Sequence, residues 1–364
     1  MNECKLKYPL MFYPVLKQTL WGGDRIIPFL SLEGEKDRCG VPYAELDHVG
    51  EYWAVSGIEG FESVVKGGEL DGVTLSELVG KYGESLMGKK NYVRFGKRFP
   101  LLVKFIDAAL DLSVQVHPND VVASSRHCSS GKDEMCYIVD SQNRAKLLSG
   151  FATPVTREQY NNMSTQQIME ALHEYEIEQG DMFYLPAGTV HSIGAGAFIA
   201  EIQQSSDITY RIYDFDRKDK AGNFRELHTA MAAEAIDFSR YGSCKIDYSL
   251  PQNCSEDAWD HAFKAVECNH FITSLMSLEN DSQKEKRFGF NYSHLDSFVI
   301  LTCVKGSCTL IYNNCCESEK ENLSQEQCRM EIRRGNAVLL PADLKNILFE
   351  IPSGISCEIL ETHI

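Results

Sequence analysis

Two stretches of the chain repeat one pattern: residues 180–187 read GDMFYLPA, and residues 335–342 read GNAVLLPA. Each joins a turn glycine to a short run with strand character, and each ends in a Leu-Pro-Ala turn. The repeat predicts two related β-domains. Since a polar stretch covers residues 240–257, we expect the first domain over residues 1–240 and the second over residues 241–364.

The rest of the chain is also rich in strand signals. Short β-rich runs, separated by Gly, Pro, Asn and Asp, lie at residues 98–106, 112–117, 135–139, 198–203 and 298–304. Helix signals are few: a capping box at Thr74 predicts a helix ending near Gly83, and boxes at Thr156 and Ser164 predict a helical insert over residues 154–175. Strands do not alternate regularly with helices, which disfavours a doubly wound sheet. We expect a mostly β protein with two jelly-roll barrels or sandwiches and a few short helices.

The composition limits the classes of function. The chain has 36 Lys and Arg against 52 Asp and Glu, a net charge of −16, which repels the phosphates of nucleic acids. No apolar run is long enough to span a membrane, and the first residues form no apolar signal segment, so we expect a cytoplasmic protein. The 13 cysteines include no CxxC pair, which disfavours a zinc knuckle and indicates mostly free thiols.

The first repeat continues into a candidate metal site. From Gly180 the chain reaches Pro186, Gly188 and His191 with a spacing that resembles the second signature of the cupin superfamily, whose jelly-roll barrels hold a metal. Pro186 and Gly188 favour a tight turn, so that His191 begins the next strand facing inward. The second copy diverges here, because Asn346 stands at the position of His191.

A second motif supplies the other candidate ligands. In residues 113–118 (SVQVHP), Gln115 and His117 are two positions apart and therefore share one face of a strand. Glu134 opens the next predicted strand and offers a carboxylate. With His191 they give two imidazoles, one carboxylate and one amide oxygen, a set that suits a Zn²⁺-class ion and leaves room for water or substrate.

Taken with these motifs, the chain resembles the type I mannose-6-phosphate isomerases of the shorter bacterial kind. The resemblance reaches to about residue 240 and is loose beyond it. Its blocks lie at residues 13–15, 21–23, 50–56, 99–104, 113–118, 132–134, 180–191 and 210–217. The chain departs from many cupins in having Gln115 where they have histidine, and its helical insert is short.

The resemblance implies a cofactor, a substrate and a reaction. It implies one zinc per chain, held at the four positions Gln115, His117, Glu134 and His191. It further implies a small sugar phosphate as the partner, with Arg211 and Lys104 as candidate catalytic residues and Lys132 and Ser113 as candidate substrate-binding residues. The implied reaction interconverts mannose 6-phosphate and fructose 6-phosphate, by moving a proton between C1 and C2 through an enediol.

Several alternatives stay open on the sequence alone. The base that takes the proton is either Lys104, with a depressed pKa, or a zinc-linked water. Lys104 is unusual because it lies in an apolar run, where burial is costly without a partner. Two other functions compete with isomerisation: an iron-dependent oxygenase, and a non-catalytic sugar-binding or regulatory module. The sequence does not indicate an oligomeric state.

Overall fold

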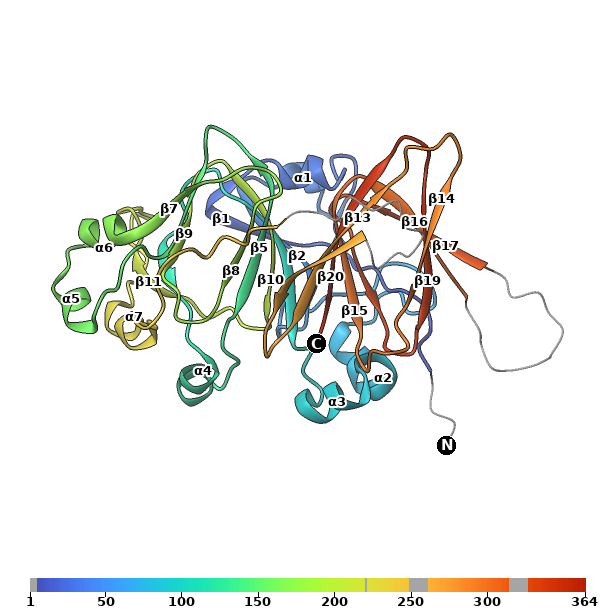
Figure 1. Ribbon diagram of the computed structural model, residues 1–364, viewed down its shortest axis with the longest axis horizontal. Helices are drawn as coiled ribbons and strands as arrows, with labels where there is room; N and C mark the ends of the chain where they lie inside the picture. Colours follow the sequence, from blue (N-terminus) through green and yellow to red (C-terminus); the bar gives the residue numbers. More distant parts are fainter. Residues whose placement is uncertain (1–4, 220, 249–260, 314–326) are drawn as a thin grey trace. The chain divides into compact units, whose positions relative to one another are not determined.

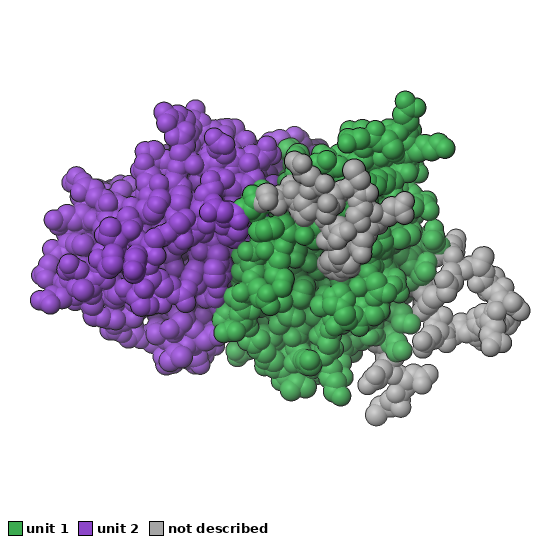
Figure 2. Space-filling model, viewed as in Figure 1, with its two compact units in different colours: residues 1–14, 54–100, 248–364 green, residues 15–53, 101–247 purple. Residues whose placement is uncertain are grey.

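The computed structural model describes residues 5–219, 221–248, 261–313 and 327–364, and its strands form antiparallel sheets (Figure 1). The chain divides into two compact units that interleave along the sequence (Figure 2). One unit comprises residues 15–53 and 101–247, and the other comprises residues 1–14, 54–100 and 248–364. Strands outnumber the short helices throughout the described residues, so the expected mostly β fold is confirmed.

The unit of residues 15–53 and 101–247 contains two sheets. The six-stranded sheet has the order β1 (Val15–Gly23), β2 (Val49–Ser56), β3 (Leu101–Asp107), β10 (Ala197–Gln204), β5 (Glu134–Ser141) and β8 (Met182–Leu185). The five-stranded sheet has the order β11 (Tyr210–Tyr213), β4 (Val114–Val116), β9 (His191–Ile193), β6 (Lys146–Phe151) and β7 (Leu172–Glu176). Ile106 and Ile138 of the first sheet share one buried core with Leu147 and Ile193 of the second, so the sheets pack face to face.

Strands β3 and β10 are buried along their whole length. Their inner face lines the core between the sheets, and their outer face lies under α1 (Ile26–Phe29), where Phe29 packs 5.2 Å from Phe105 and 4.7 Å from Phe198 between ring centroids. Burial on both faces explains why the sequence of β3 is an almost continuous apolar run. Lys104 interrupts that run, and its position on the inner face is the first sign of a polar site.

The helices of this unit are short. Besides α1, they are η1 (Tyr43–Glu45), α4 (Asp120–His127), α5 (Arg157–Asn162), α6 (Thr165–Ala171) and α7 (Thr229–Ala235). The capping boxes at Thr156 and Ser164 are both formed, as the sequence predicts. The helical insert is shorter than the expected residues 154–175, because residues from Leu172 onward pair with β6 as strand β7. No helix in the described ranges is long and apolar enough to cross a membrane.

The other unit also contains two sheets. The five-stranded sheet has the order β12 (Ala262–Glu267), β13 (Ile272–Glu279), β20 (Ser356–His363), β15 (Val299–Lys305) and β18 (Ala337–Leu340). The four-stranded sheet has the order β14 (Lys286–Asn291), β19 (Asn346–Ile351), β16 (Ser307–Asn313) and β17 (Gln327–Arg333). Side chains from both sheets form a single apolar core. Two helices, α2 (Leu75–Met87) and α3 (Lys89–Phe95), belong to this unit, and α2 leaves helical geometry at Gly83, where φ is 43°.

Residues 1–14 and 54–100 belong with the C-terminal strands rather than with the metal-binding unit, although the sequence assigns them to a domain over residues 1–240. Three contacts show the reason. Leu10 forms a β-bridge with Leu339, the ring of Phe99 lies 4.7 Å from that of Phe298, and Asp296 accepts hydrogen bonds from the first amides of α3. No local sequence pattern marks such long-range contacts.

Candidate metal centre and its pocket

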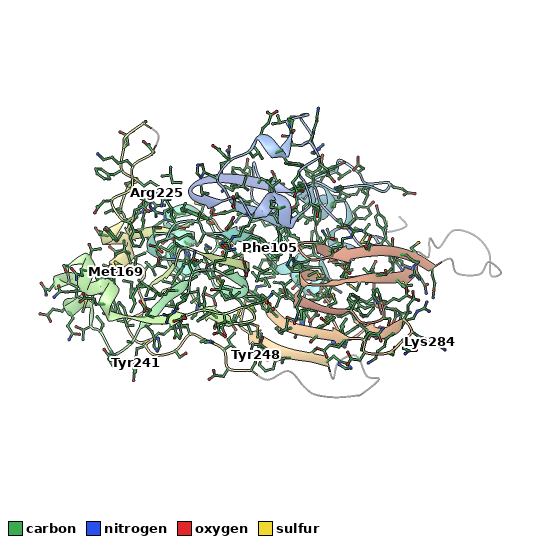
Figure 3. All side chains as sticks on the ribbon, turned by 90° about the horizontal axis from the view of Figure 1, so that it is seen from above. Phe105, Met169, Arg225, Tyr241, Tyr248 and Lys284 are labelled. Atoms are coloured by element: carbon green, nitrogen blue, oxygen red, sulfur yellow. The ribbon has the colours of Figure 1, made fainter. Side chains whose placement is uncertain are left out.

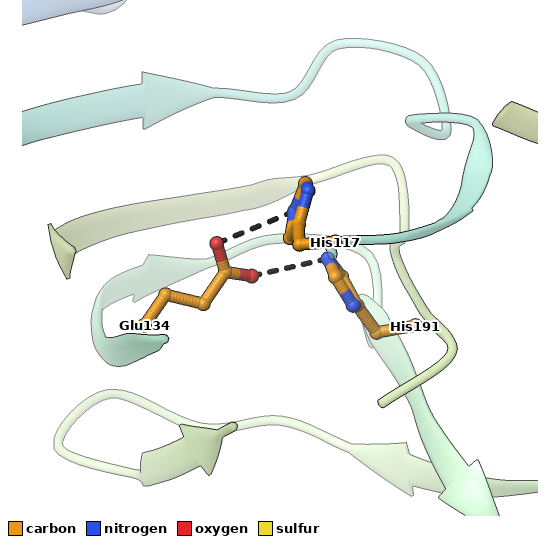
Figure 4. A group of neighbouring side chains, drawn as sticks. All are labelled: His117, Glu134 and His191. Carbon is orange, nitrogen blue, oxygen red and sulfur yellow. Dashed lines mark ion pairs between the residues drawn. The ribbon is translucent and has the colours of Figure 1, made fainter. Parts of the chain in front are cut away.

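His117, Glu134 and His191 converge inside the unit of residues 15–53 and 101–247 (Figure 4). His117 Nε2 lies 3.4 Å from Glu134 Oε2, and His191 Nε2 lies 3.1 Å from Glu134 Oε1. All three donor atoms lie within 4.8 Å of one another, and each residue is at most 2% exposed. Three residues far apart in the sequence therefore present two imidazoles and one carboxylate to a common point.

The local fold fixes these three positions. His117 follows β4, Glu134 begins β5 and His191 begins β9. The turn before His191 needs glycine at 188: φ there is +90°, and a Cβ atom would lie 2.9 Å from the backbone of Asp237. The Gly188 amide also donates to the carbonyl of His117 at 2.9 Å, which ties the turn to the other histidine.

Both histidines have the tautomer that metal binding needs. His117 Nδ1 lies 2.8 Å from the carbonyl oxygen of Ile208, and His191 Nδ1 lies 2.9 Å from that of Thr189. A carbonyl only accepts, so each Nδ1 carries a proton and each Nε2 is the ring nitrogen that faces Glu134. Burial, with the charge of Lys132, lowers the pKa of His117 well below its usual range, which keeps the ring neutral. Two imidazoles and a carboxylate fit Zn²⁺.

Glu134 is held as a carboxylate. Burial alone raises its pKa, but the positive charge of Lys132 acts in the opposite direction, and the pKa lies well below the usual range. Lys132 Nζ lies 3.2 Å from Glu134 Oε2 and 3.2 Å from His117 Nε2. The ammonium group of Lys132 therefore lies beside the donor atoms of Glu134 and His117. A metal ion bound by these residues would also neutralise the Glu134 carboxylate.

Gln115 and Ser113 lie against the same group. Gln115 is directly opposite His191 in the pairing of β4 with β9, and its Nε2 lies 3.2 Å from His191 Nε2. The Gln115 Oε1 accepts a hydrogen bond from Ser113 Oγ at 3.1 Å. The amide thus contacts the metal-binding group through its nitrogen here, while its oxygen faces Ser113.

The buried lysine of β3 has a partner that the sequence did not reveal. Lys104 Nζ lies 3.0 Å from Glu201 Oε1, and the two residues are directly opposite in the pairing of β3 with β10. Burial alone lowers the pKa of Lys104, but Glu201, Glu51 and further carboxylates together raise it above its usual range. The depressed pKa expected for a lysine base is therefore wrong, because the fold supplies a buried counter-ion.

A cavity of about 450 Å³ opens beside the metal-binding group. The predicted residues Lys104, Ser113, Gln115, Lys132 and Arg211 all line it. It is also lined by charged residues that sequence reasoning missed, namely Lys17, Glu51, Glu201, Asp207 and Arg225. Only one feature of the sequence could have indicated Glu201: it is a charged residue inside the apolar run of β10, as Lys104 is inside the apolar run of β3.

Cations predominate on the β11 side of the cavity. Arg211 is directly opposite Gln115 in the pairing of β11 with β4, and its Nη1 donates to the carbonyl of Glu226 at 2.9 Å. Arg225, labelled in Figure 3, donates through Nε to Asp214 at 2.7 Å, and Arg217 pairs with the same carboxylate. Burial, then the charge of Arg225, lowers the pKa of Arg211. The guanidinium groups of Arg217 and Arg225 share the one carboxylate of Asp214, and Arg211 adds a third positive charge beside them, in a chain of net charge −16.

The unit of residues 1–14, 54–100 and 248–364 repeats the strand framework without the metal-binding side chains. Asn346, the counterpart of His191 in the sequence repeat, is exposed, and the next residue, Ile347, points into the apolar core. Glu361 of β20 corresponds to Glu201 of β10, but it lies opposite Ser274 and Leu301 instead of a lysine. Among the described residues, His117, Glu134 and His191 form the one group suited to hold a metal.

Glu361→Gln is expected to stabilise the protein at alkaline pH. Burial raises the pKa of Glu361 from 4.5 to about 7, so the folded state retains a proton that the unfolded state has lost, and stability falls as pH rises between these values. The neutral amide removes this loss. The variant should gain on the order of 3 kcal/mol in unfolding free energy relative to wild type between pH 4.5 and pH 8.

Urea unfolding of both proteins at these two pH values measures the gain. Glu358→Gln is the matched control, because Glu358 lies on the same strand and pairs with Lys305 at 2.7 Å near the surface. Its effect should differ little between the two pH values. An equal effect of Glu361→Gln at both would show that Glu361 does not titrate in this range.

Comparisons with known proteins agree with one another. Residues 11–145 match the family model for the catalytic domain of type I phosphomannose isomerase. The mannose-6-phosphate isomerase ManA of Bacillus subtilis is 39% identical over 63% of this chain and 68% of its own length. A mannose 6-phosphate isomerase structure from Bacillus subtilis matches 98% of this chain and 99% of its own, with 27% identity and a TM-score of 0.76. A mannose 6-phosphate isomerase bound with zinc and yttrium has a similar fold, with 15% identity and a TM-score of 0.64.

Proposed function

The chain belongs to the type I phosphomannose isomerase family, and we propose that Gln115, His117, Glu134 and His191 hold its metal. Its activity is that of a zinc-dependent mannose-6-phosphate isomerase, which interconverts mannose 6-phosphate and fructose 6-phosphate. The observation that carries the assignment of the site is the convergence of two histidines and a carboxylate beside a cation-lined cavity. When bound, zinc supplies the positive charge that stabilises an oxygen as it becomes anionic.

The residues of the chain have to bind, orient and protonate the sugar. Lys104 is held protonated by Glu201, so we propose that it donates a hydrogen bond to a substrate oxygen and does not act as the base. Arg211 neighbours Gln115 across two paired strands, which supports a role for its charge next to the reacting carbons. A guanidinium group keeps its charge at any pH relevant here, and it can donate two parallel hydrogen bonds.

We propose that Lys132 and Ser113 orient the substrate. Both line the cavity next to a metal-binding residue: Lys132 contacts Glu134, and Ser113 donates to Gln115. The phosphate needs further positive charge, and the β11 side of the cavity, with Arg225 next to Arg211, supplies it. The named relatives are isomerases, which favours isomerisation over the oxygenase and over the non-catalytic module.

The proposed site is confined to the unit of residues 15–53 and 101–247, so we expect one zinc per chain. The other unit, which covers most of the expected domain over residues 241–364, then has no metal. We propose that the enzyme's partners are sugar phosphates and not nucleic acids or membranes, because a net charge of −16 repels polyanions.

An isomerase assay on the purified chain tests the function. We expect turnover of mannose 6-phosphate, a loss of about a hundredfold or more after chelation, and recovery with zinc. In deuterium oxide, mannose 6-phosphate formed from fructose 6-phosphate should carry solvent deuterium at C2, because the proton passes through the enediol. Sugar-phosphate binding without turnover by the zinc-loaded chain would instead support the non-catalytic module.

A further inference from the structure

Three cysteines meet in the core of the unit without the metal site. Cys303 on β15, Cys308 on β16 and Cys357 on β20 are each at most 2% exposed and belong to the same apolar core. The Sγ atoms of Cys303 and Cys357 lie 3.8 Å apart, which is direct contact between two thiols. Cys357 also interacts with the thiol of Cys308, so it stands between the other two.

A tight turn brings the three sulfur atoms together. Cys303 and Cys308 flank the β15–β16 turn at Gly306, where φ is +71° and a Cβ atom would lie 1.9 Å from the carbonyl oxygen of Ser356. The turn therefore packs directly on the start of β20, next to Cys357. Cys303 Sγ lies 3.4 Å from the carbonyl oxygen of Lys305, which accepts its proton.

We propose that Cys303 and Cys357 form an oxidisable dithiol, a redox modification site separate from the isomerase centre, with Cys308 as an alternative partner for Cys357. The contact distance, the presence of a third thiol and the shared position under one turn carry this inference. Its oxidant is a small hydroperoxide such as hydrogen peroxide. The product is a disulfide that joins β15 to β20.

The chemistry proceeds in two steps. The Cys357 thiolate attacks one peroxide oxygen, so that an S–O bond forms, the O–O bond breaks and hydroxide leaves as water after taking a proton. The Cys303 sulfur then attacks the sulfenic sulfur of Cys357 and loses its proton, and the S–O bond breaks to release a second water. Two thiols and one peroxide thus give one disulfide and two waters.

Cys357 is the thiol best placed to react first. Its interactions with the thiols of Cys303 and Cys308 lower its pKa below the usual thiol value, although burial opposes them. Cys136 offers the contrast among the described residues: it is buried, and its Sγ lies 3.9 Å from Glu201 Oε2 and not beside a second described thiol. We expect Cys136 to stay reduced under the same conditions.

The cluster lies one residue below the surface. Lys305 and Gly306 in the turn are exposed, and so is Ile355, which is 38% exposed two positions before Cys357. We expect local opening of this turn to admit a small peroxide without unfolding of the core. Oxidation should therefore be slower than at the exposed Cys39 and Cys128, and it should still occur in the folded protein.

Peptide mapping of the full, zinc-loaded chain after peroxide treatment tests the proposal. Wild type should yield a peptide pair cross-linked between Cys303 and Cys357, with the loss of two hydrogen atoms. Cys308→Ser should leave this bridge unchanged, and Cys303→Ser should redirect it to Cys308. With both replaced, Cys357 should remain a sulfenic acid that dimedone traps.

Cys268→Ser is the matched control, because Cys268 is a partly buried thiol of the same unit whose Sγ donates to the carbonyl oxygen of Phe271. It should not change the bridge. The folded wild-type chain should be kept in peroxide for many hours after Cys39 has been fully oxidised. If Cys303 and Cys357 are then still reduced, the proposal is overturned. A bridge in wild type between Cys357 and any cysteine other than Cys303 or Cys308 would also overturn it. Neither result depends on isomerase activity.

Discussion

Replacing His191 with alanine is expected to remove zinc from the purified chain and to lower kcat/KM by about a thousandfold or more. The imidazole faces Glu134 at 3.1 Å, and no other described histidine besides His117 lies in the donor group. Because His191 sits at the end of a strand and not within the main apolar core, the variant should stay folded. Metal analysis, circular dichroism and the isomerase assay on one preparation measure the three quantities.

Two control variants isolate the metal effect. His173→Ala removes a histidine of the same unit that stacks on Tyr175, 4.2 Å between ring centroids, and it should keep full zinc content. Asn346→Ala changes the residue that corresponds to His191 in the sequence repeat, in the other unit, and should also leave one zinc per chain. If His191→Ala retained close to one zinc per chain, His191 would not be a ligand, and two zinc ions in wild type would contradict the assignment of a single site.

Arg211→Lys is expected to lower kcat by about a hundredfold, the effect typical of removing one preorganised donor. Lysine keeps the positive charge but loses the planar group that grips two oxygens. Zinc content should not change, since a guanidinium group cannot bind a cation. Steady-state kinetics on mannose 6-phosphate, with metal analysis of the same sample, measures both.

The kinetic pattern decides the role of Arg211. A loss mainly in kcat supports stabilisation of the developing enediolate, whereas a loss mainly in KM would assign Arg211 to the phosphate. A lower melting temperature with unchanged kcat per folded molecule would make it a structural residue. Arg240→Lys is a suitable control, because Arg240 is an exposed arginine that pairs with Asp237 at 2.8 Å, and its kinetics should match wild type.

Much of this fold can be read from local patterns. The strands around Gln115 and His191 follow from alternation and from turn residues, and the capping boxes at Thr156 and Ser164 begin helices where expected. These features depend on neighbours in sequence. The convergence of His117, Glu134 and His191 was also predictable, because each begins or follows a recognisable strand beside a turn.

Other features depend on the register between distant strands. Glu201 pairs with Lys104 only because β10 lies antiparallel to β3 with these two residues opposite each other, and no motif announces that register. Arg225 reaches the cavity from the segment after β11, which has no regular pattern of its own. Asn346 aligns with His191 in sequence but faces outward, since an alternating strand reverses its faces with a shift of one residue.

The interleaving of the two units has a consequence for how the chain is made. Residues 54–100 leave the ribosome early, yet the strands that complete their unit begin after residue 261. During synthesis the apolar face of α2, with Leu75, Leu78 and Val79, must wait for more than half of the chain to emerge before its native partners exist. The metal-binding unit is complete at residue 247 and can form first. The nascent chain should therefore form the strands of its candidate metal site while α2 still lacks the C-terminal strands of its own unit.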